Sequence, residues 1–276
     1  MSDPLPILVP IDGTGDMRAV DLSMQLASAA GTSVRILSVV SDPGVAAERK
    51  TDITKAAAEL GDVPFEVLVV VNDAIDDAIV EDAASAAIVC MTTAATLLPH
   101  EGHFGSIAES VVRSLERSVL LLGPKATGRL AAPPARLVVP VDGSEAGEYI
   151  VEGAARMAKL VGAEVWVVTV VSSELERKVE AAVGHDYGAL QSGYVRRIAR
   201  DIGRRSGFEA QFEVLHQSNP ADAILDFAGS DGMVAMSTHG RSGLARIFAG
   251  SVTTEVVAGS PRPVLVVRPP SHSLPA

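Results

Sequence analysis

The chain repeats itself once at long range, and this repeat limits its possible folds more than any other sequence feature. Ile7–Thr14 (ILVPIDGT) reappears as Leu137–Ser144 (LVVPVDGS) at an offset of 130 residues, which pairs Asp12 with Asp142. The apolar run Val34–Val40 reappears as Val165–Val171 at an offset of 131. This period is too long for a solenoid repeat, so the sequence predicts two tandem domains.

The domain boundaries follow from the composition between the two copies. Lys125–Pro134 (KATGRLAAPP) contains a glycine and two consecutive prolines, as is typical of a linker rather than of a helix or strand. We therefore predict a first domain over 1–124, a linker over 125–134 and a second domain over 135–276. The second copy carries additional, largely polar residues in its middle, within 172–208.

Apolar runs alternate with segments of helical spacing in both copies. We expect strands near 6–11, 34–40, 65–71, 87–92 and 119–122, and again near 137–141, 165–171, 212–215, 233–236 and 264–267. Several of these runs are apolar throughout or nearly so, such as 165–171 and 264–267, which is typical of strands buried on both faces of a parallel sheet. The sequence therefore predicts the α/β class, with two tandem, Rossmann-like, doubly wound parallel-sheet domains of five strands each.

The charge of the chain excludes several partners. Its formal net charge is −11, and residues 1–124 account for this, with 7 basic and 18 acidic residues, whereas residues 125–276 hold equal numbers of each. No basic face for nucleic acid is expected, and the C-terminal half is the better place for an anionic ligand.

The single cysteine, Cys90, excludes an internal disulfide and a multi-cysteine metal site. We expect no membrane partner and a cytoplasmic location, because we find neither a signal peptide nor a membrane-spanning run.

Candidate binding residues of the second copy follow the predicted strands at their carboxyl ends, where doubly wound sheets bind ligands. Pro140, Val141 and Asp142 end the first strand of that copy, and Val170 lies at the end of the second. The fourth strand is followed by Ser237–Gly240. We expect these segments to meet at one edge of the sheet.

A glycine-rich stretch then leads to a predicted helix over 252–257. Glycines let backbone N–H groups approach a phosphate closely, and Gly250–Ser251 would place free N–H groups at the start of that helix. Arg241 and Arg246 add positive charge to the same stretch. Short glycine patterns are weak signals, so a loop merely shaped by Gly240, Gly243 and Gly250 stays an open alternative.

Taken together, this stretch resembles the ATP-binding pattern of the universal stress protein family, G-x2-G-x9-G-[ST]. Ser237, Gly240, Gly250 and Ser251 meet its spacing, with Ser237 in place of the first glycine, and Thr238–Gly243 (THGRSG) is similar to the family's signature. The resemblance covers nearly the whole chain, as the tandem-domain form. It implies an adenine nucleotide alpha-hydrolase-like fold, binding of ATP with Mg2+, homodimerisation, and a role in stress response or dormancy.

The resemblance also implies residue roles. Asp142 would lie near the ribose and phosphates, the backbone at Val170 would hold the adenine, and Gly240, Gly250 and Ser251 would hold the phosphates. The cofactor-binding residues that we predict in the second copy are Pro140, Val141, Asp142, Val170, Ser237, His239, Gly240, Arg241, Gly243, Gly250, Ser251 and Val252. We predict neither a catalytic residue nor a protein-held metal.

The first copy keeps only part of this pattern. Thr92 and Ala95 replace the first two glycines, and the following loop carries Glu101 and no arginine. Its weaker candidate residues for nucleotide binding are Asp12, Val39, Gly105 and Ser106. A scaffold domain without a ligand is the alternative, because anion sites need both donors and a favourable field.

Three functions are compatible with the sequence. The first is an ATP-binding regulator that is not an enzyme, with ATP changing its conformation or its choice of regulatory protein partner. The second is a slow ATPase or nucleotidyl transferase on the same fold, although no base or acceptor site is apparent. The third is a nucleotide-free interaction scaffold. The motifs of P-loop NTPases, dinucleotide-binding domains, serine hydrolases and zinc proteases are absent.

Overall fold

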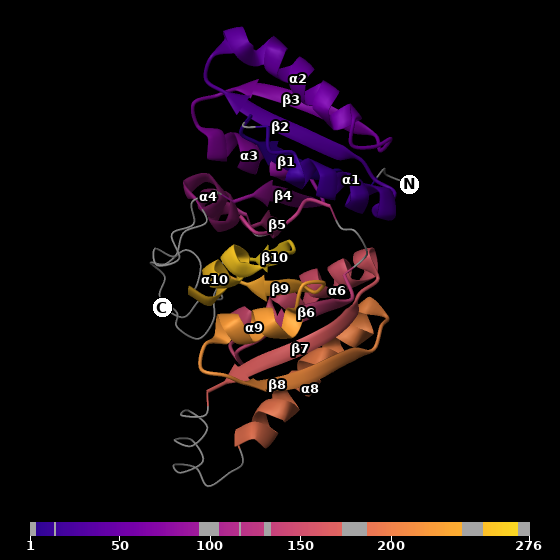
Figure 1. Ribbon diagram of the computed structural model, residues 1–276, viewed down its shortest axis with the longest axis vertical. Helices are drawn as coiled ribbons and strands as arrows, with labels where there is room; N and C mark the ends of the chain where they lie inside the picture. Colours follow the sequence, from indigo (N-terminus) through magenta and orange to yellow (C-terminus); the bar gives the residue numbers. More distant parts are fainter. Residues whose placement is uncertain are drawn as a thin grey trace.

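The computed structural model describes residues 4–13, 15–93, 105–115, 117–129, 134–172, 187–238 and 251–269 (Figure 1). Within each half, strands alternate with helices, as the hydrophobic runs predict. Among the described residues, no helix combines the length and the apolar character needed to cross a lipid bilayer.

The N-terminal half contains five parallel strands in the order β3-β2-β1-β4-β5. Its elements are β1 (Ile7–Ile11), α1 (Arg18–Ala30), β2 (Val34–Val40), the short 3-10 helix η1 (Pro43–Val45), α2 (Ala46–Ala58), β3 (Phe65–Val71), α3 (Ile75–Ala83), β4 (Ile88–Thr92), α4 (Ser106–Ser114) and β5 (Ser118–Leu122). The strand order reverses between β1 and β4, which is the switch point of a doubly wound sheet.

The C-terminal half repeats this arrangement in the order β10-β9-β6-β7-β8. Its elements are β6 (Arg136–Pro140), α5 (Glu145–Glu148), α6 (Ile150–Val161), β7 (Glu164–Val171), α8 (Tyr187–Ser206), β8 (Ala210–His216), α9 (Pro220–Ala228), β9 (Met233–Ser237), α10 (Ser251–Gly259) and β10 (Val264–Val267). The additional residues of this half include α8, which is longer than its counterpart α2. The predicted α/β class and the parallel pairing within each half are confirmed.

The two halves join edge to edge, which was not predicted from the sequence. Strand β5 pairs antiparallel with β10, so one sheet of ten strands runs through the whole molecule (Figure 1). Leu120 lies opposite Leu265 in this pair, and both side chains are almost fully buried. The pairing satisfies the backbone groups of two strands that would otherwise be sheet edges. The ends of the ten-stranded sheet are β3 and β8.

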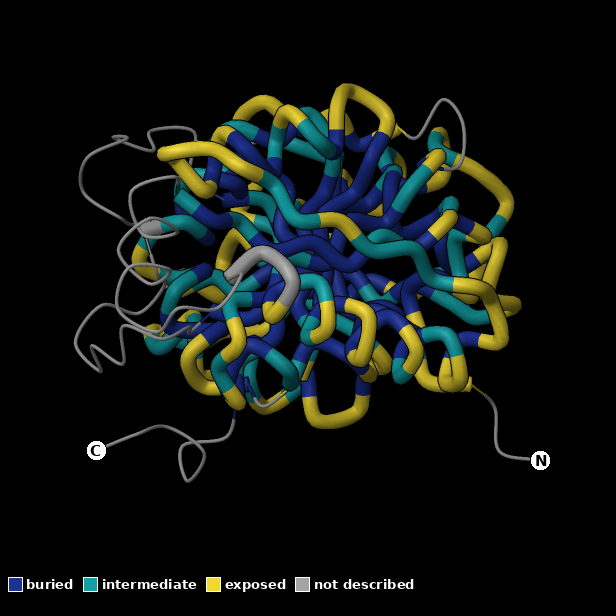
Figure 2. Tube along the Cα trace, turned by 90° about the horizontal axis from the view of Figure 1, so that it is seen from below, coloured by how far each residue is buried: buried dark blue, intermediate teal, exposed yellow. Residues whose placement is uncertain are grey.

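Helices cover both faces of this sheet, so the strands form the buried centre seen in Figure 2. One core cluster takes its helical side chains from α1, α2, α6 and α8, and a second takes them from α3, α4, α9 and α10. Cys90 is fully buried in the first cluster. Burial raises the pKa of its thiol to about 12, which keeps it protonated and unreactive, as expected of a core residue.

The chain that follows β5 is packed between the halves. A Cβ atom at Gly123 would lie 1.9 Å from the carbonyl oxygen of Val257 in α10, so only glycine fits this close approach. The N–H of Thr127 donates to the carbonyl oxygen of Pro261 at 3.3 Å. Helix α1 also packs against α6. The halves are therefore held by side-chain and backbone contacts in addition to the β5–β10 pair.

Candidate functional site

The C-terminal half brings part of the predicted site together at one edge of the sheet. Strand β6, which ends at Pro140, lies between β7 and β9, so Asp142, Val170 and Ser237 occupy neighbouring strand ends. The N–H of Val141 donates to the carbonyl oxygen of Val168 at 2.9 Å. This hydrogen bond holds the chain that follows β6 beside β7.

Helix α10 begins at Ser251, and its second residue, Val252, packs against the core cluster that contains β9. Thr253 Oγ1 donates to the carbonyl oxygen of Ser237 at 3.3 Å, which ties the first turn of α10 to the end of β9. His239, Gly240, Arg241, Gly243 and Gly250 lie outside the described residues.

Asp142 is held by the turn that leads into α5. Its Oδ1 accepts hydrogen bonds from the N–H of Ser144 at 3.0 Å and from Ser144 Oγ at 2.6 Å. Ser144 Oγ in turn accepts from the N–H of Gly147 at 2.9 Å and caps α5. The Asp-Gly-Ser sequence at 142–144 was a signal for such a turn, because aspartate and serine bond to backbone N–H groups a few residues further on. This geometry keeps the Asp142 carboxylate at the strand end.

Ser237 occupies the position of the first glycine in the family pattern, and its side chain is buried there. The residue is 8% exposed, and its buried Oγ has no hydrogen-bond partner among the described residues. A buried hydroxyl without a partner is unfavourable by about 1–3 kcal/mol, so a ligand oxygen at this strand end would stabilise it.

Tyr194 of α8 is a neighbour of this edge that the sequence did not reveal. Burial raises the pKa of its phenol to about 12, and the nearby Glu148 carboxylate adds to the rise. Arg197 pairs with Glu148 and lies with its guanidinium carbon 5.4 Å from the centre of the Tyr194 ring. The arginines of α8 are exposed and pair with different partners. Arg204 and Arg205 pair with Asp201 within the helix, whereas Arg197 joins α8 to α5.

The N-terminal half has an open cavity of about 550 Å³ at the corresponding sheet edge. Its walls come from the ends of β1, β2 and β4, from α3, and from the start of α4. All four weaker candidate residues, Asp12, Val39, Gly105 and Ser106, line it together with Pro10, Ile11, Asp16, Arg18, Leu37, Ile75, Ile79, Met91, Thr92, Thr93, Ile107 and Ala108. The structure thus brings together every predicted residue of the first copy.

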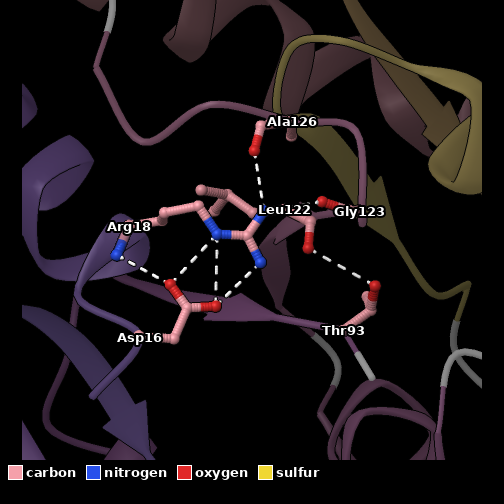
Figure 3. A network of polar contacts seen from close by, with 6 residues as sticks. All are labelled: Asp16, Arg18, Thr93, Leu122, Gly123 and Ala126. Carbon is pink, nitrogen blue, oxygen red and sulfur yellow. Dashed lines mark hydrogen bonds and ion pairs between the residues drawn. The ribbon is translucent and has the colours of Figure 1, made fainter. Parts of the chain in front are cut away.

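An ion pair in this cavity wall was not predicted. Arg18 donates from Nε to Asp16 Oδ1 at 3.0 Å and from Nη2 to Asp16 Oδ2 at 2.7 Å, as Figure 3 shows. Its Nη1 donates to the carbonyl oxygens of Gly123 at 3.1 Å and Ala126 at 2.7 Å. Arg18 therefore joins the cavity wall to the chain segment that connects the two halves.

The ion pair makes the stability of the protein sensitive to acid. The hydrogen bond from Arg18 lowers the pKa of Asp16 below its ordinary value of 3.8, against the opposing effect of burial. A carboxyl whose pKa is lower in the folded state stabilises the fold above its unfolded pKa, and this contribution is lost as the pH falls through the folded pKa. The pair therefore contributes at neutral pH and fades below about pH 4.

Replacing Arg18 with Leu tests this role. We expect a loss of about 1–3 kcal/mol in the free energy of unfolding at pH 7, because Asp16 loses its ion-pair partner and two carbonyl oxygens lose a charged donor. The difference between the variant and the unmodified protein should shrink as the pH falls below 4. Urea unfolding at pH 7 and pH 3 measures both effects, and an equal loss at the two pH values would contradict the assignment.

Comparisons with known proteins agree with the resemblance seen in the sequence. Residues 135–268 match the model of the universal stress protein family. The universal stress protein MJ0531 of Methanocaldococcus jannaschii is 28% identical over 145 residues, which are 49% of this chain and 82% of that protein. The universal stress protein Rv1996 of Mycobacterium tuberculosis is 27% identical over 176 residues. That match covers 60% of this chain and only 54% of the relative.

A solved structure shares the fold over the full length. The crystal structure of a universal stress protein from Archaeoglobus fulgidus aligns with a TM-score of 0.64 at 15% identity, and the alignment covers 98% of each chain. At this identity the likeness concerns the fold. It shows that both halves, and not only residues 135–268, are arranged as in that protein.

Proposed function

Since residues 135–268 match the model of the universal stress protein family, we propose that the chain is an ATP-binding regulator whose C-terminal half holds the nucleotide. The observation that supports this most directly is the convergence of Asp142, Val170, Ser237 and the start of α10 at one edge of the sheet. The start of a helix presents free N–H groups and the positive end of its dipole, which favours phosphate.

The described residues suggest how the nucleotide would be held. Asp142, fixed by Ser144, would accept hydrogen bonds from ribose hydroxyls or orient a phosphate-bound Mg2+. The backbone at Val170 would hydrogen-bond the adenine, and the unpaired Oγ of Ser237 would meet a ligand oxygen. No group of three or more potential metal-ligating side chains occurs among the described residues, so Mg2+ would arrive bound to the phosphates.

Binding without catalysis is sufficient for a regulator, because a ligand that favours one conformation shifts the population toward it. A route for such a shift starts at the proposed phosphate position, since α10 begins there and its Val257 lies against Gly123 beside the β5–β10 pair. We propose on the same basis that the protein acts in stress response or dormancy, as a homodimer that binds regulatory proteins.

Calorimetric titration with ATP and Mg2+ tests the proposal. We expect binding of ATP to be weakened at least about tenfold by Val170→Phe, because the larger ring fills the expected adenine position. Val39→Phe, the equivalent change in the N-terminal half, should leave ATP binding unchanged. Circular dichroism would establish that both variants are folded.

The outcomes separate the three candidate functions. The absence of any heat or thermal shift with ATP would favour a nucleotide-free scaffold. Turnover of ATP at about 1 s⁻¹ or faster would favour an enzyme. Equal loss of ATP binding in both variants would place the site elsewhere than proposed.

A further inference from the structure

The outer side of β3 (Phe65–Val71) is one end of the ten-stranded sheet (Figure 1), and we call it the β3 edge. On its inner side, the carbonyl oxygen of Pro64 accepts from the N–H of Val34 of β2. The N–H of Asn72 donates to the carbonyl oxygen of Val40. Because backbone groups alternate in direction along a strand, even-numbered residues bond to β2. The groups that point away from β2 belong to Phe65, Val67, Val69 and Val71.

The β3 edge lacks the features that protect outer strands from pairing with other chains, such as proline, lysine or a bulge. Its sequence, FEVLVVV, is apolar apart from Glu66, and its register with β2 is unbroken over seven residues. The outer strand at the other end of the sheet, β8, differs. There Glu213 Oε1 accepts a hydrogen bond at 3.2 Å from the N–H of Val214, which points away from β7. Only the β3 edge therefore combines unprotected backbone groups with an almost wholly apolar strand.

Apolar side chains are exposed around the carboxyl end of the β3 edge. Accessibility rises along the strand, from the buried Val67 to Val70 and Val71, which are 37% and 49% exposed. Val45 of η1, which follows β2, and Ile75, the first residue of α3, are each 39% exposed. Exposed apolar side chains beside unpaired backbone groups suit an extended peptide that adds to the sheet as a further strand.

The two faces of the β3 edge differ in their surroundings. Phe65, Val67 and Val69 pack into the core cluster that contains α2, whereas Leu68 packs into the cluster that contains α3. On the α2 side, basic and acidic side chains are mixed along the helix: Glu48, Arg49, Lys50, Asp52 and Lys55. This side of the strand is apolar and its neighbouring helix is close to neutral, so it favours apolar residues in a partner.

The α3 side of the β3 edge is acidic. Residues 56–93 contain eight acidic residues and neither lysine nor arginine. Some of these charges are compensated, because Arg35 of β2 pairs with Glu66 and Asp82. Asp76 accepts a hydrogen bond from Ser110, and Arg113 lies close enough to help lower its pKa. The acidic residues here that are exposed and form no ion pair among the described residues are Asp73, Asp77 and Glu81.

From these observations we infer that the β3 edge binds an extended, basic segment of a partner protein by strand addition. Alternate residues of this segment are apolar toward α2 and lysine or arginine toward α3, where they meet the exposed carboxylates. A second copy of this chain is a poorer occupant, because residues 1–124 carry a net charge of −11 in each copy. The inference goes beyond the proposed function, since it involves neither the C-terminal strand ends nor a nucleotide.

Calorimetric titration of the full chain without ATP tests the inference. The probe is a synthetic peptide of about ten residues in which valine alternates with lysine. We expect it to bind, and a peptide with glutamate in place of lysine to bind at least about tenfold more weakly, because like charges then meet. Methylation of the backbone nitrogens of the valine–lysine peptide should also weaken binding at least about tenfold, because strand pairing needs its N–H donors.

Val71→Pro tests the location. The N–H of Val71 points away from β2, so proline removes an outward donor without breaking the β2–β3 ladder. Binding of the valine–lysine peptide should weaken at least about tenfold. Val71→Thr keeps this N–H and a side chain of similar shape, so its affinity should stay within about twofold. Circular dichroism checks the folding of both variants, and the methylated peptide makes the same test on the unmodified protein if Val71→Pro does not fold.

Asp77→Lys tests the charge on the α3 side. The variant should bind the valine–lysine peptide at least about threefold more weakly, because it places a cation beside the lysine residues of the peptide. The matched control is Asp222→Lys, since Asp222 is the third residue of α9 as Asp77 is of α3. It makes the same change in net charge, at the same helical position, away from the β3 edge. Its affinity for the peptide should be unchanged.

Four results would overturn the inference. These are no binding of the valine–lysine peptide, equal binding of the valine–glutamate peptide, equal affinities in Val71→Pro and Val71→Thr, and equal effects of Asp77→Lys and Asp222→Lys. Dimerisation of the unmodified protein that is lost in Val71→Pro would assign the β3 edge to a second copy instead, and analytical ultracentrifugation measures this. Failure of the proposed function is distinguishable, because that proposal is tested with ATP and Val170→Phe.

Discussion

Replacing Gly250 with Glu is expected to abolish ATP binding. Gly250 immediately precedes α10, which begins at Ser251, and the expected phosphate position lies at this helix start. A carboxylate introduced there repels the phosphates and itself occupies the positive end of the helix dipole. Two charges about 4 Å apart near a protein surface interact by about 4 kcal/mol, so we expect a loss of affinity of at least about 100-fold. Calorimetric titration with ATP and Mg2+ measures it.

The control for this change comes from the other half of the chain. Gly105 is the sequence equivalent of Gly250, but its φ of +97° makes any other residue strained there. Ser106→Glu, at the first position of α4, introduces the same charge without that strain. We expect ATP affinity to be unchanged in Ser106→Glu. An unchanged ATP affinity in Gly250→Glu would show that the phosphates do not bind at the start of α10.

Replacing Leu120 with Ala should give the largest loss of stability. Leu120 lies in β5 opposite Leu265 of β10 and is fully buried, so the shorter side chain leaves a cavity at the junction of the two halves. Such substitutions in protein cores lower the free energy of unfolding by about 2–5 kcal/mol. Denaturant unfolding measures this loss, with Leu5→Ala as the control, because Leu5 is 50% exposed.

The same variant tests whether the halves unfold together. A single transition, shifted to lower denaturant, is expected when the fluorescence of Trp166 in β7 and the far-ultraviolet circular dichroism are followed. Trp166 reports only on the C-terminal half, whereas circular dichroism reports on both. Transitions that separate in the unmodified protein would show that the β5–β10 pair does not couple the halves.

Arg18 links the wall of the N-terminal cavity to the other half of the molecule. It donates hydrogen bonds to the carbonyl oxygens of Gly123 and Ala126, and Gly123 lies against Val257 near the end of α10. These contacts add to the β5–β10 pair and to the packing of α1 against α6.

The amino-acid sequence by itself determined the class of fold, the repeat and the place of the strands. Apolar runs such as Val264–Val267 became strands at those residues, because continuous burial on both sheet faces leaves an uninterrupted apolar run in the sequence. It also singled out Asp12, Val39, Gly105 and Ser106, which the cavity brings together, because the ends of parallel strands meet at one sheet edge.

Other features depended on partners far apart in the chain, and only the tertiary structure decided them. The antiparallel β5–β10 pair, the contact of Gly123 with Val257, and the bonds from Arg18 to Gly123 and Ala126 each join residues more than a hundred positions apart. Hydrophobic periodicity and motif spacing do not identify which edge strands pair with each other. Backbone hydrogen bonds can form between any two extended strands. Tyr194 was not predicted for the same reason, because the residues that surround it come from distant parts of the chain.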